Sequence, residues 1–314
     1  MKIPSVNTRH LLKVTDFSSE EIINLFSLAQ SLKKAQKKGK KHHLLKGKVL
    51  GMIFEKSSTR TRVSFETGIY HLGGTGLFLG KNDLQIGRGE PISDTAAVLS
   101  RYLDGIMIRT FEHSKAEDFA KYGSIPVING LTDDYHPCQA LTDYFTMFEK
   151  LSKFKGTKLA YIGDGNNMAH SLMLCGAMLG VSVSIASPAD YAPNKEITDE
   201  ARSIAARNGS EIVITESIDE AAKNADVLYT DVWASMGQED EAEKRAKSFD
   251  GYCISMDLIK RNAPEAYVMH CLPAHRGEEI TAEVLDSDHS IIFDEAENRL
   301  HVQKAIMTVL MNSR

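Results

Sequence analysis

Short apolar runs alternate with longer segments of helical period along almost the whole chain, and this pattern constrains the fold more than any other feature. Such alternation is typical of βαβ units, whose strands pair in a parallel sheet. The pattern occurs twice, before and after Lys155-Gly156. The sequence therefore predicts an α/β protein with two Rossmann-like domains, residues 1–150 and 151–314, each with a central parallel β-sheet flanked by helices.

The expected strands are short and rich in β-branched or other apolar residues. In the first half they are Val49–Phe54, Thr75–Leu79, Gly105–Arg109 and Ile125–Ile128. In the second half they are Lys158–Ile162, Val181–Ala186, Glu211–Ile214, Val227–Thr230, Tyr267–His270 and Ile291–Phe293. Ligands of parallel α/β sheets bind beyond the carboxyl ends of the strands, where the topology switches. The residues that follow these strands are therefore the candidates for a site.

Several expected helices carry start or stop signals. They include Ser18–Lys37, Thr61–Leu72, Ser93–Leu103, Ser114–Tyr122 and Glu295–Asn312. Ser18 and Glu21 have the spacing of a capping box at the start of the first helix. The last helix, at about 295–314, is expected to pack back on the first domain.

Composition argues against several classes of protein. A net charge of −5 is unfavourable for a protein that works by neutralising nucleic-acid phosphates. No run approaches the about 20 apolar residues of a membrane span, and four scattered cysteines are too few for a disulfide framework. We expect a cytoplasmic protein without a nucleic-acid or membrane partner. The lysine-rich tract 33–48 is interpreted as a solvated face, with a polyanion or membrane patch as the alternative.

A cluster of phosphate-type donors follows the first strand. Residues 55–62 read EKSSTRTR and lead directly into a helix. Hydroxyl groups, a guanidinium and backbone N–H groups at the positive end of a helix make a site for phosphate. A serine N-cap beside surface arginines is the alternative interpretation.

Two further strand ends supply groups that suit a carbonyl and an amide. Arg109 ends its strand and should emerge at the same sheet edge, while His136-Pro137-Cys138-Gln139 opens another helix. His136 offers a donor for a carbonyl oxygen, and Gln139 offers an acceptor for an amide N–H. Together with residues 55–62, these groups describe a small carbonyl-phosphate compound that carries an amide. A surface arginine and a capping histidine are the alternatives.

In the second half, residues 161–170 (YIGDGNNMAH) imitate the glycine fingerprint of dinucleotide-binding proteins. The third position of the fingerprint falls on Met168, and the next strand lacks the acidic residue that binds a ribose, which disfavours NAD. The polar side chains of this turn, Asn167 above all, can face another ligand. Asp231 follows a later strand, and with Ser235 it offers an acid and a hydroxyl that suit an ammonium group.

The segment His270-Cys271-Leu272-Pro273 follows another strand. With His275 it can be mistaken for a metal site, but the spacing matches no common zinc pattern, so no metal is predicted. Cys271 as a covalent nucleophile, with His136 or His270 as its base, is an alternative. Nothing in the sequence requires an acyl-enzyme.

These segments, taken in order, resemble the aspartate/ornithine transcarbamoylase family over nearly the whole chain. The matching segments are Ser58–Arg62, Arg109-Thr110, His136–Gln139, Asp231–Gly237 and His270–Pro273. The resemblance implies transfer of the carbamoyl group of carbamoyl phosphate to the side-chain amine of L-ornithine, in arginine biosynthesis and without a cofactor. Putrescine or N-acetylornithine is the alternative acceptor. The first domain would bind carbamoyl phosphate and the second would bind ornithine.

The resemblance also implies residue roles. The residues implied to bind carbamoyl phosphate are Ser58, Thr59, Arg60, Thr61, Gln85, Arg109, His136, Gln139, Cys271, Leu272 and Arg299. Those implied to be catalytic are Thr61, Arg109, His136 and Cys271, and those implied to bind ornithine are Asn167, Asp231, Ser235 and Met236. Gln85 would come from a neighbouring subunit of a homotrimer, or of a multiple of trimers, with active sites at subunit interfaces.

Overall fold

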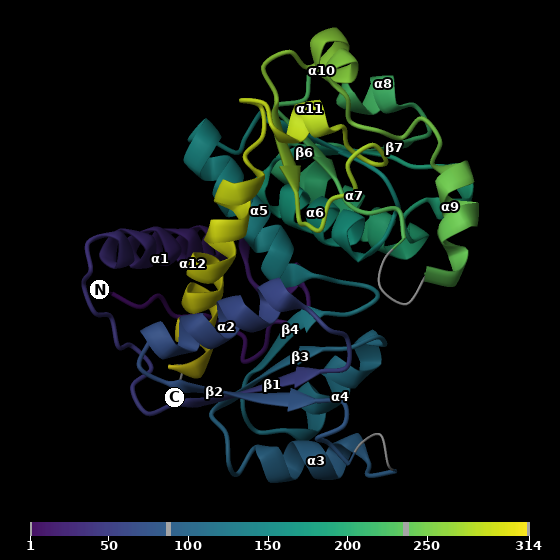
Figure 1. Cartoon of the computed structure of the whole chain (residues 1–314). Helices are drawn as coiled ribbons and strands as arrows, with labels where there is room; N and C mark the ends of the chain where they lie inside the picture. The colour runs from purple at the N-terminus through teal and green to yellow at the C-terminus, as the bar shows by residue number, and fades with distance from the viewer. Residues whose placement is uncertain (1, 86–88, 235–238, 313–314) are drawn as a thin grey trace. The chain divides into compact units, whose positions relative to one another are not determined.

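The computed structural model describes residues 2–85, 89–234 and 239–312, which form two parallel β-sheets with helices packed against them (Figure 1). This architecture confirms the predicted fold class. The chain divides into two compact units, each with one of the sheets. No helix within the three described ranges is long and apolar enough to cross a membrane.

The first unit is discontinuous in sequence. It contains Met1–Thr142 and the C-terminal segment Glu297–Arg314, whereas the second unit contains Asp143–Ala296. The chain passes between the units inside two helices, α5 (Pro137–Leu151) and α12 (Ile292–Met311). Most of the C-terminal helix therefore belongs to the first unit.

The sheet of the first unit has the order β2-β1-β3-β4, and all neighbouring strands are parallel. Its strands are β1 (Val49–Phe54), β2 (Thr75–Gly80), β3 (Gly105–Arg109) and β4 (Val127–Leu131). The chain runs from β1 outward to β2 and then returns to β3 on the other side of β1. The topology therefore switches between β1 and β3, where Phe54 pairs with Arg109.

Helices cover both faces of this sheet (Figure 1). They are α1 (Ser19–Lys37), α2 (Thr59–His71), α3 (Ile92–Leu99), α4 (His113–Tyr122) and the end of α12. On one face, Ala96 of α3 and Phe119 of α4 pack with Ile106 of β3. On the other face α2 and α12 are in close contact, because a Cβ added at Gly68 would lie 2.9 Å from the Met307 side chain.

The sheet of the second unit has the order β7-β6-β5-β8-β9, again with parallel neighbours. Its strands are β5 (Lys158–Ile162), β6 (Ser182–Ala186), β7 (Ile212–Thr215), β8 (Val227–Thr230) and β9 (Tyr267–His270). After β7 the chain returns to the other side of β5. The switch point therefore lies between β5 and β8, where Ile162 pairs with Thr230.

The helices of the second unit surround this sheet. They are α6 (Asn167–Leu179), α7 (Lys195–Asn208), α8 (Ile218–Ala222), α9 (Ala242–Ser248), α10 (Met256–Asn262) and α11 (Ala282–Leu285). The apolar core includes Leu228 and Val268 from the strands, with Leu258 of α10 and Val284 of α11. Helices α6 and α7 pack against each other.

One predicted strand, Ile291–Phe293, is wrong, because α12 begins at Ile292. Ile291 and Ile292 are buried but Phe293 is 77% exposed, and two acidic residues follow in the first helical turn. A short apolar triplet does not distinguish a strand from the start of a buried helix. The predicted capping box is confirmed: Ser18 is the N-cap of α1, and its hydroxyl accepts the N–H of Glu21.

Candidate functional site

The N-terminus of α2 lies directly beyond the carboxyl end of β1. Ser58 is the N-cap of α2, and its hydroxyl oxygen accepts the backbone N–H of Thr61 at 3.2 Å. Ser58 and Arg60 are half-buried, Thr59 is exposed and Thr61 is buried. The first-turn N–H groups and the positive end of the helix dipole thus lie at the edge of the sheet, and such an arrangement can bind an anion.

Arg299, on α12, connects residues that lie far apart in the sequence. Its guanidinium donates to the hydroxyl of Thr61 at 3.2 Å and to the side-chain oxygen of Gln139. With the Gln303 amide oriented to satisfy its neighbours, the Gln303 oxygen also accepts from Arg299 at 3.0 Å. Arg299 is only 4% exposed. The structure thus brings Thr61, Gln139 and Arg299 together in the first unit.

Arg109 ends β3 and His136 lies directly before α5, and both side chains are buried. Burial, together with the nearby cations of Arg299 and Arg109, holds the pKa of His136 well below its usual value. His136 is therefore neutral at physiological pH. A neutral imidazole donates one hydrogen bond to a carbonyl oxygen without adding charge beside the two guanidinium groups.

Gln85 is exposed on the loop that follows β2, and no described contact joins it to the Arg299 cluster.

Lys56 was not among the residues predicted to form the site. Its buried side chain pairs with Asp133 at 2.6 Å and lies 4.3 Å from the centroid of the Phe111 ring. Its place between β1 and the N-cap of α2 is the sequence signal that could have identified it.

In the second unit, the glycine turn after β5 packs tightly against another loop. A Cβ added at Gly165 would lie 2.3 Å from the backbone nitrogen of Pro193, so this position requires glycine. Asn166 is the N-cap of α6 and accepts the N–H of Met168 at 2.9 Å. Asn167 is half-buried at the first position of the helix. Met168 is buried in the position that a dinucleotide fingerprint gives to its third glycine.

A buried ion pair anchors this turn. Asp164 accepts from Arg245 at 2.8 Å, and the same guanidinium donates to the carbonyl oxygen of Trp233 at 3.0 Å. Burial raises the pKa of Asp164 to about 6, although the Arg245 charge acts in the opposite direction. Arg245 thus connects the β5 turn to the segment after β8. It was not predicted, because its charged partner Asp164 lies 81 residues away in the sequence.

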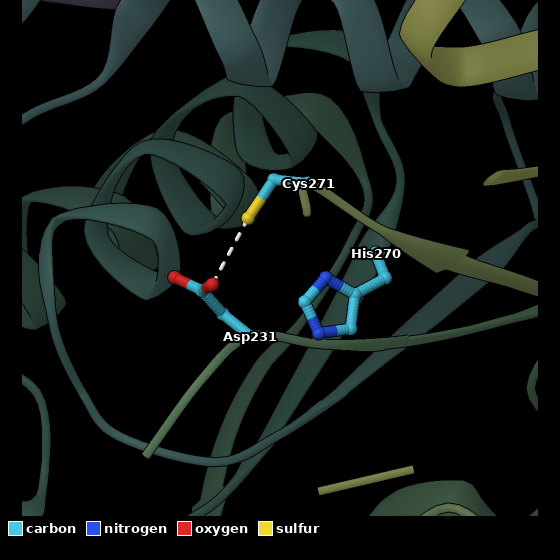
Figure 2. A group of neighbouring side chains, drawn as sticks. All are labelled: Asp231, His270 and Cys271. Carbon is cyan, nitrogen blue, oxygen red and sulfur yellow. Dashed lines mark hydrogen bonds between the residues drawn. The ribbon is translucent and has the colours of Figure 1, made fainter. Parts of the chain in front are cut away.

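Asp231 and Cys271 follow the neighbouring strands β8 and β9. The Cys271 thiol donates to Asp231 Oδ1 at 3.1 Å (Figure 2), and the same oxygen accepts the N–H of Val232 at 2.8 Å. Burial, and then the negative charges of Asp231 and Glu295, raise the pKa of Cys271 well above its usual value. The thiol therefore stays protonated, which makes it a poor covalent nucleophile.

His270 directly precedes Cys271 (Figure 2), and both of its ring nitrogens form hydrogen bonds with residues that follow in the chain. Its Nδ1 accepts the N–H of Leu272 at 2.8 Å, and its Nε2 lies 3.0 Å from Glu279 Oε1, to which it donates. The side chains of His270 and Glu279 are fully buried. Leu272 has a φ of +58°, a left-handed conformation that neighbouring contacts must hold in a non-glycine residue.

Asp231, His270 and Cys271 lie close enough together to suggest a metal site, because their ligand atoms are within 4.8 Å of one another. However, both ring nitrogens of His270 already form hydrogen bonds. The imidazole therefore has no lone pair left for a metal ion. The group is better described as a hydrogen-bond network than as a metal centre.

Two predicted ornithine-binding residues, Ser235 and Met236, lie outside the described residues. The segment that leads to them contains Val232 and Trp233, which are buried. Asp231, directly before this segment, is 7% exposed. In the second unit, the structure thus brings Asp231 and Cys271 together, while Asn167 begins α6 after the adjacent β5 turn.

The fold and the residues at its strand ends define a two-unit α/β enzyme of the transferase class. Residues 9–149 match the carbamoyl-P binding domain of aspartate/ornithine carbamoyltransferase, and residues 155–310 match its Asp/Orn binding domain. The chain belongs to the aspartate/ornithine carbamoyltransferase family.

Full-length relatives and solved structures agree with this placement. The ornithine carbamoyltransferase of Oceanobacillus iheyensis is 57% identical over 96% of this chain and 94% of its own length. The anabolic enzyme of Pyrococcus furiosus is 52% identical over 98% of each chain. The solved structure of ornithine carbamoyltransferase from Pyrococcus furiosus has a TM-score of 0.95 at 51% identity and covers 100% of both chains. That of the anabolic enzyme from Campylobacter jejuni has a TM-score of 0.91 at 43% identity, covering 98% of this chain and 100% of that one.

Proposed function

We propose that the protein transfers the carbamoyl group of carbamoyl phosphate to the side-chain amine of L-ornithine, which gives L-citrulline and phosphate. The observation that carries the proposal is the cluster of Thr61, Gln139 and Arg299 at the N-terminus of α2. It combines a hydroxyl, an amide and a guanidinium with a helix terminus, which suits a ligand with a phosphate, a carbonyl and an amide. The names of the full-length relatives support ornithine over putrescine or N-acetylornithine as the acceptor.

Carbamoyl phosphate is assigned mainly to residues 1–150 and ornithine to residues 151–314, although three proposed carbamoyl phosphate contacts, Cys271, Leu272 and Arg299, come from the second region. The proposed carbamoyl phosphate contacts are Ser58, Thr59, Arg60, Thr61, Gln85, Arg109, His136, Gln139, Cys271, Leu272 and Arg299. The side-chain oxygen of Gln139 accepts from Arg299, and this contact orients the amide that is proposed to bind the carbamoyl NH₂. The proposed ornithine contacts are Asn167, Asp231, Ser235 and Met236.

The ionisation states of the second unit support this assignment. The protonated thiol of Cys271 donates to Asp231, and so does a backbone N–H. Both hydrogen bonds end on Oδ1 and fix the orientation of the carboxyl group that is proposed to pair with the α-ammonium group of ornithine. In this proposal Cys271 contributes its backbone and its thiol proton to the site, rather than a nucleophilic sulfur.

The proposed reaction is a direct attack of the neutral side-chain amine on the carbonyl carbon. A C–N bond forms and the carbonyl electron pair moves to oxygen, giving a tetrahedral intermediate. The intermediate collapses as the C–O bond to phosphate breaks and the amine loses its proton. Thr61, Arg109 and His136 stabilise the oxyanion, and removing one such donor typically lowers kcat by roughly 10²–10³.

The amine must lose its proton before it attacks. An aliphatic ammonium group has a pKa of about 10, so only about one molecule in 10³ is reactive at pH 7. We therefore expect kcat/KM for ornithine to rise about tenfold per pH unit between pH 7 and 9. A flat profile over this range would contradict attack by the free amine.

The test of the proposed function uses the purified full chain. Carbamoyl phosphate is mixed in turn with ornithine, aspartate, putrescine and N-acetylornithine, and phosphate and the carbamoylated product are measured. We expect turnover with ornithine, and a large loss in the Thr61→Val variant, which keeps the shape of the side chain but removes its hydroxyl. Turnover of putrescine or N-acetylornithine in preference to ornithine would correct the acceptor, and no turnover with any amine would refute the function.

We also infer a homotrimer, or a multiple of trimers, in which Gln85 completes the site of a neighbouring subunit. The exposed position of Gln85 and its separation from the Arg299 cluster support this inference. At a carbamoyl phosphate concentration too low for either variant to turn over well, mixing Gln85→Ala and Arg60→Ala subunits should restore part of the activity, because hybrid assemblies contain sites with both native residues. Lack of recovery on subunit exchange would refute shared sites.

The biosynthetic direction and the location in the cell are further proposals. Relatives with the printed name anabolic support a place in arginine biosynthesis. The four cysteines are free thiols, which supports a reducing, cytoplasmic environment.

A further inference from the structure

The first unit contains a cavity of about 520 Å³ at the end of α2 that is remote from the phosphate-type donors. We call it the basic pocket. The residues used here to define it are Gln36, Lys40, Lys41, His42, His43 and His71. Most of them belong to the lysine-rich tract 33–48, for which the proposed reaction has no use.

The basic pocket is separate from the carbamoyl phosphate site. Ser58 caps the beginning of α2, whereas His71 is the last residue of that helix. A helix of 13 residues spans about 20 Å. The pocket also includes Gly73 and Gly74, which precede the first residue of β2 and so lie at the amino edge of the sheet.

A buried cation lies directly beneath the basic pocket. Lys304 of α12 is 0% exposed, and its ammonium donates to Gln36 Oε1 at 2.6 Å and lies 3.2 Å from His42 Nε2. Among the described residues, no carboxylate forms an ion pair with Lys304, and none lines the pocket. Burying a charge without an opposite charge is unfavourable, so an anion in the pocket would offset the unfavourable free energy of burying the Lys304 ammonium.

Two imidazoles of the basic pocket, those of His42 and His71, would gain protons on anion binding. Burial, with the nearby charge of Lys304, lowers the pKa of His71, and burial also lowers the pKa of His42. The two rings lie 6.2 Å apart, and His71 Nδ1 is buried without a hydrogen-bond partner. A dianion between them would favour their protonation, and each ring would then offer a charged donor.

Size and charge together define the ligand class. Lys40 and Lys41 are exposed and add two cations to the lining of the cavity, as expected of a site that attracts a multiply charged anion. The cavity falls within the range of small-molecule sites and exceeds what a single inorganic ion fills. We propose that the basic pocket binds a small phosphoryl-bearing anion, at a site distinct from the carbamoyl phosphate site.

The test uses the full-length protein with inorganic pyrophosphate as the probe, followed by NMR of the histidine ring C–H signals. His42, His43 and His71 are assigned with single His→Gln variants. We expect saturable shifts with a single Kd, and an upward displacement of the pKa of His42 and His71 in the complex. The same shifts should persist in Arg60→Ala, which impairs the proposed substrate-phosphate site.

Variants separate a defined site from general attraction to a basic surface. Replacing Lys40 and Lys41 together by Ala should weaken pyrophosphate binding about tenfold, because two exposed cations that line the cavity are removed. Lys46→Ala is the matched control, since Lys46 is exposed in the same tract but does not line the cavity. Equal effects of the double variant and the control, or shifts that do not saturate, would overturn the proposal.

Two further arms address the chemistry of the ligand. Inorganic phosphate should bind more weakly than pyrophosphate, and citrate should bind more weakly than either if the pocket prefers phosphoryl groups. Citrate binding as tight as pyrophosphate overturns that preference. Histidine signals that no probe shifts in the assembled protein overturn the site itself, and would point to a carboxylate of a second copy as the occupant.

Discussion

Replacing Glu279 tests whether the buried His270–Glu279 pair holds the backbone of Leu272 in place. Glu279 Oε1 accepts from His270 Nε2 at 3.0 Å and from the backbone N–H of His275 at 2.6 Å. Glu279→Leu removes the acceptor of both hydrogen bonds, whereas Glu279→Gln keeps a carbonyl oxygen at the same position. Because both side chains of the pair are fully buried, water does not readily replace a lost acceptor.

The expected effect on stability follows from the number of buried hydrogen-bond donors that lose their acceptor. Each buried donor left without an acceptor costs about 1–3 kcal/mol, so Glu279→Leu should lower the free energy of unfolding by about 2–6 kcal/mol. Such a loss is a large part of the about 5–15 kcal/mol that stabilises a typical domain. Glu279→Gln should lose less, because both donors keep a partner.

The expected effect on activity follows from the tautomer of His270. With Glu279 present, the proton stays on Nε2 and leaves Nδ1 free to accept the N–H of Leu272. Without it, the proton can move to Nδ1, which then no longer accepts. Leu272 would leave a left-handed conformation that is unfavourable by about 1–3 kcal/mol. We expect kcat/KM for carbamoyl phosphate to fall about 10²-fold in Glu279→Leu, the effect of a small misplacement of a binding group.

Three measurements check this reasoning. Urea unfolding gives the free energy of each variant, initial rates of citrulline formation at a fixed folded concentration give kcat and KM, and ¹⁵N NMR of His270 reports its tautomer. The Nε2–H form is expected in the native protein and in Glu279→Gln. Equal losses of activity in the Gln and Leu variants, or an Nδ1–H ring in the native protein, would refute the positioning role.

Three further perturbations address the two substrate sites. Arg60→Ala should raise KM for carbamoyl phosphate at least about tenfold with an unchanged unfolding midpoint. The reason is that a charge-assisted hydrogen bond contributes about 1.5–3 kcal/mol to binding. Unaltered steady-state kinetics would exclude the phosphate role of Arg60. Asp231→Asn should weaken ornithine binding more than carbamoyl phosphate binding. Equal losses of affinity for the two substrates in calorimetry would contradict the assignment of Asp231 to ornithine. His136 has a lowered pKa, so the unfolded state binds its proton more tightly and stability falls as the pH drops below about 6.5. His136→Gln should remove up to about 1.4 kcal/mol per pH unit from that slope, and identical urea titrations of both proteins at pH 5 and 7 would be inconsistent with a buried neutral imidazole.

Much of the fold could be predicted from the sequence because its strands are short, apolar and bounded by polar turns. The five strands β1, β3, β5, β8 and β9 begin and end where they were predicted. The strand expected at Ile125–Ile128 instead runs from Val127 to Leu131. Pro126 has no N–H for the ladder, so regular pairing begins after it. The strand prediction at Ile291–Phe293 was wrong for a different reason. Two adjacent buried isoleucines are compatible with the start of a helix as well as with a strand.

In the candidate site, contacts between residues close in the sequence could be predicted, whereas contacts between distant residues could not. The N-cap role of Ser58 is encoded within four residues, and it was accessible from the sequence. The contact of Arg299 with Gln139 joins residues 160 apart, and that of Arg245 with Asp164 joins residues 81 apart. Local patterns carry no information about such pairs. The resemblance named Arg299, but only the folded chain shows which groups it holds.

The discontinuity of the first unit has a consequence for the order in which the protein forms. During synthesis, every residue of the second unit, Asp143–Ala296, leaves the ribosome before the segment Glu297–Arg314 that the first unit needs. Arg299 and Lys304, the partners of Thr61 and Gln36, arrive last. Chain growth therefore delivers a complete second unit while the first still lacks one of its helices. The N-terminal half can therefore complete its fold only after the segment that begins at Glu297 has left the ribosome.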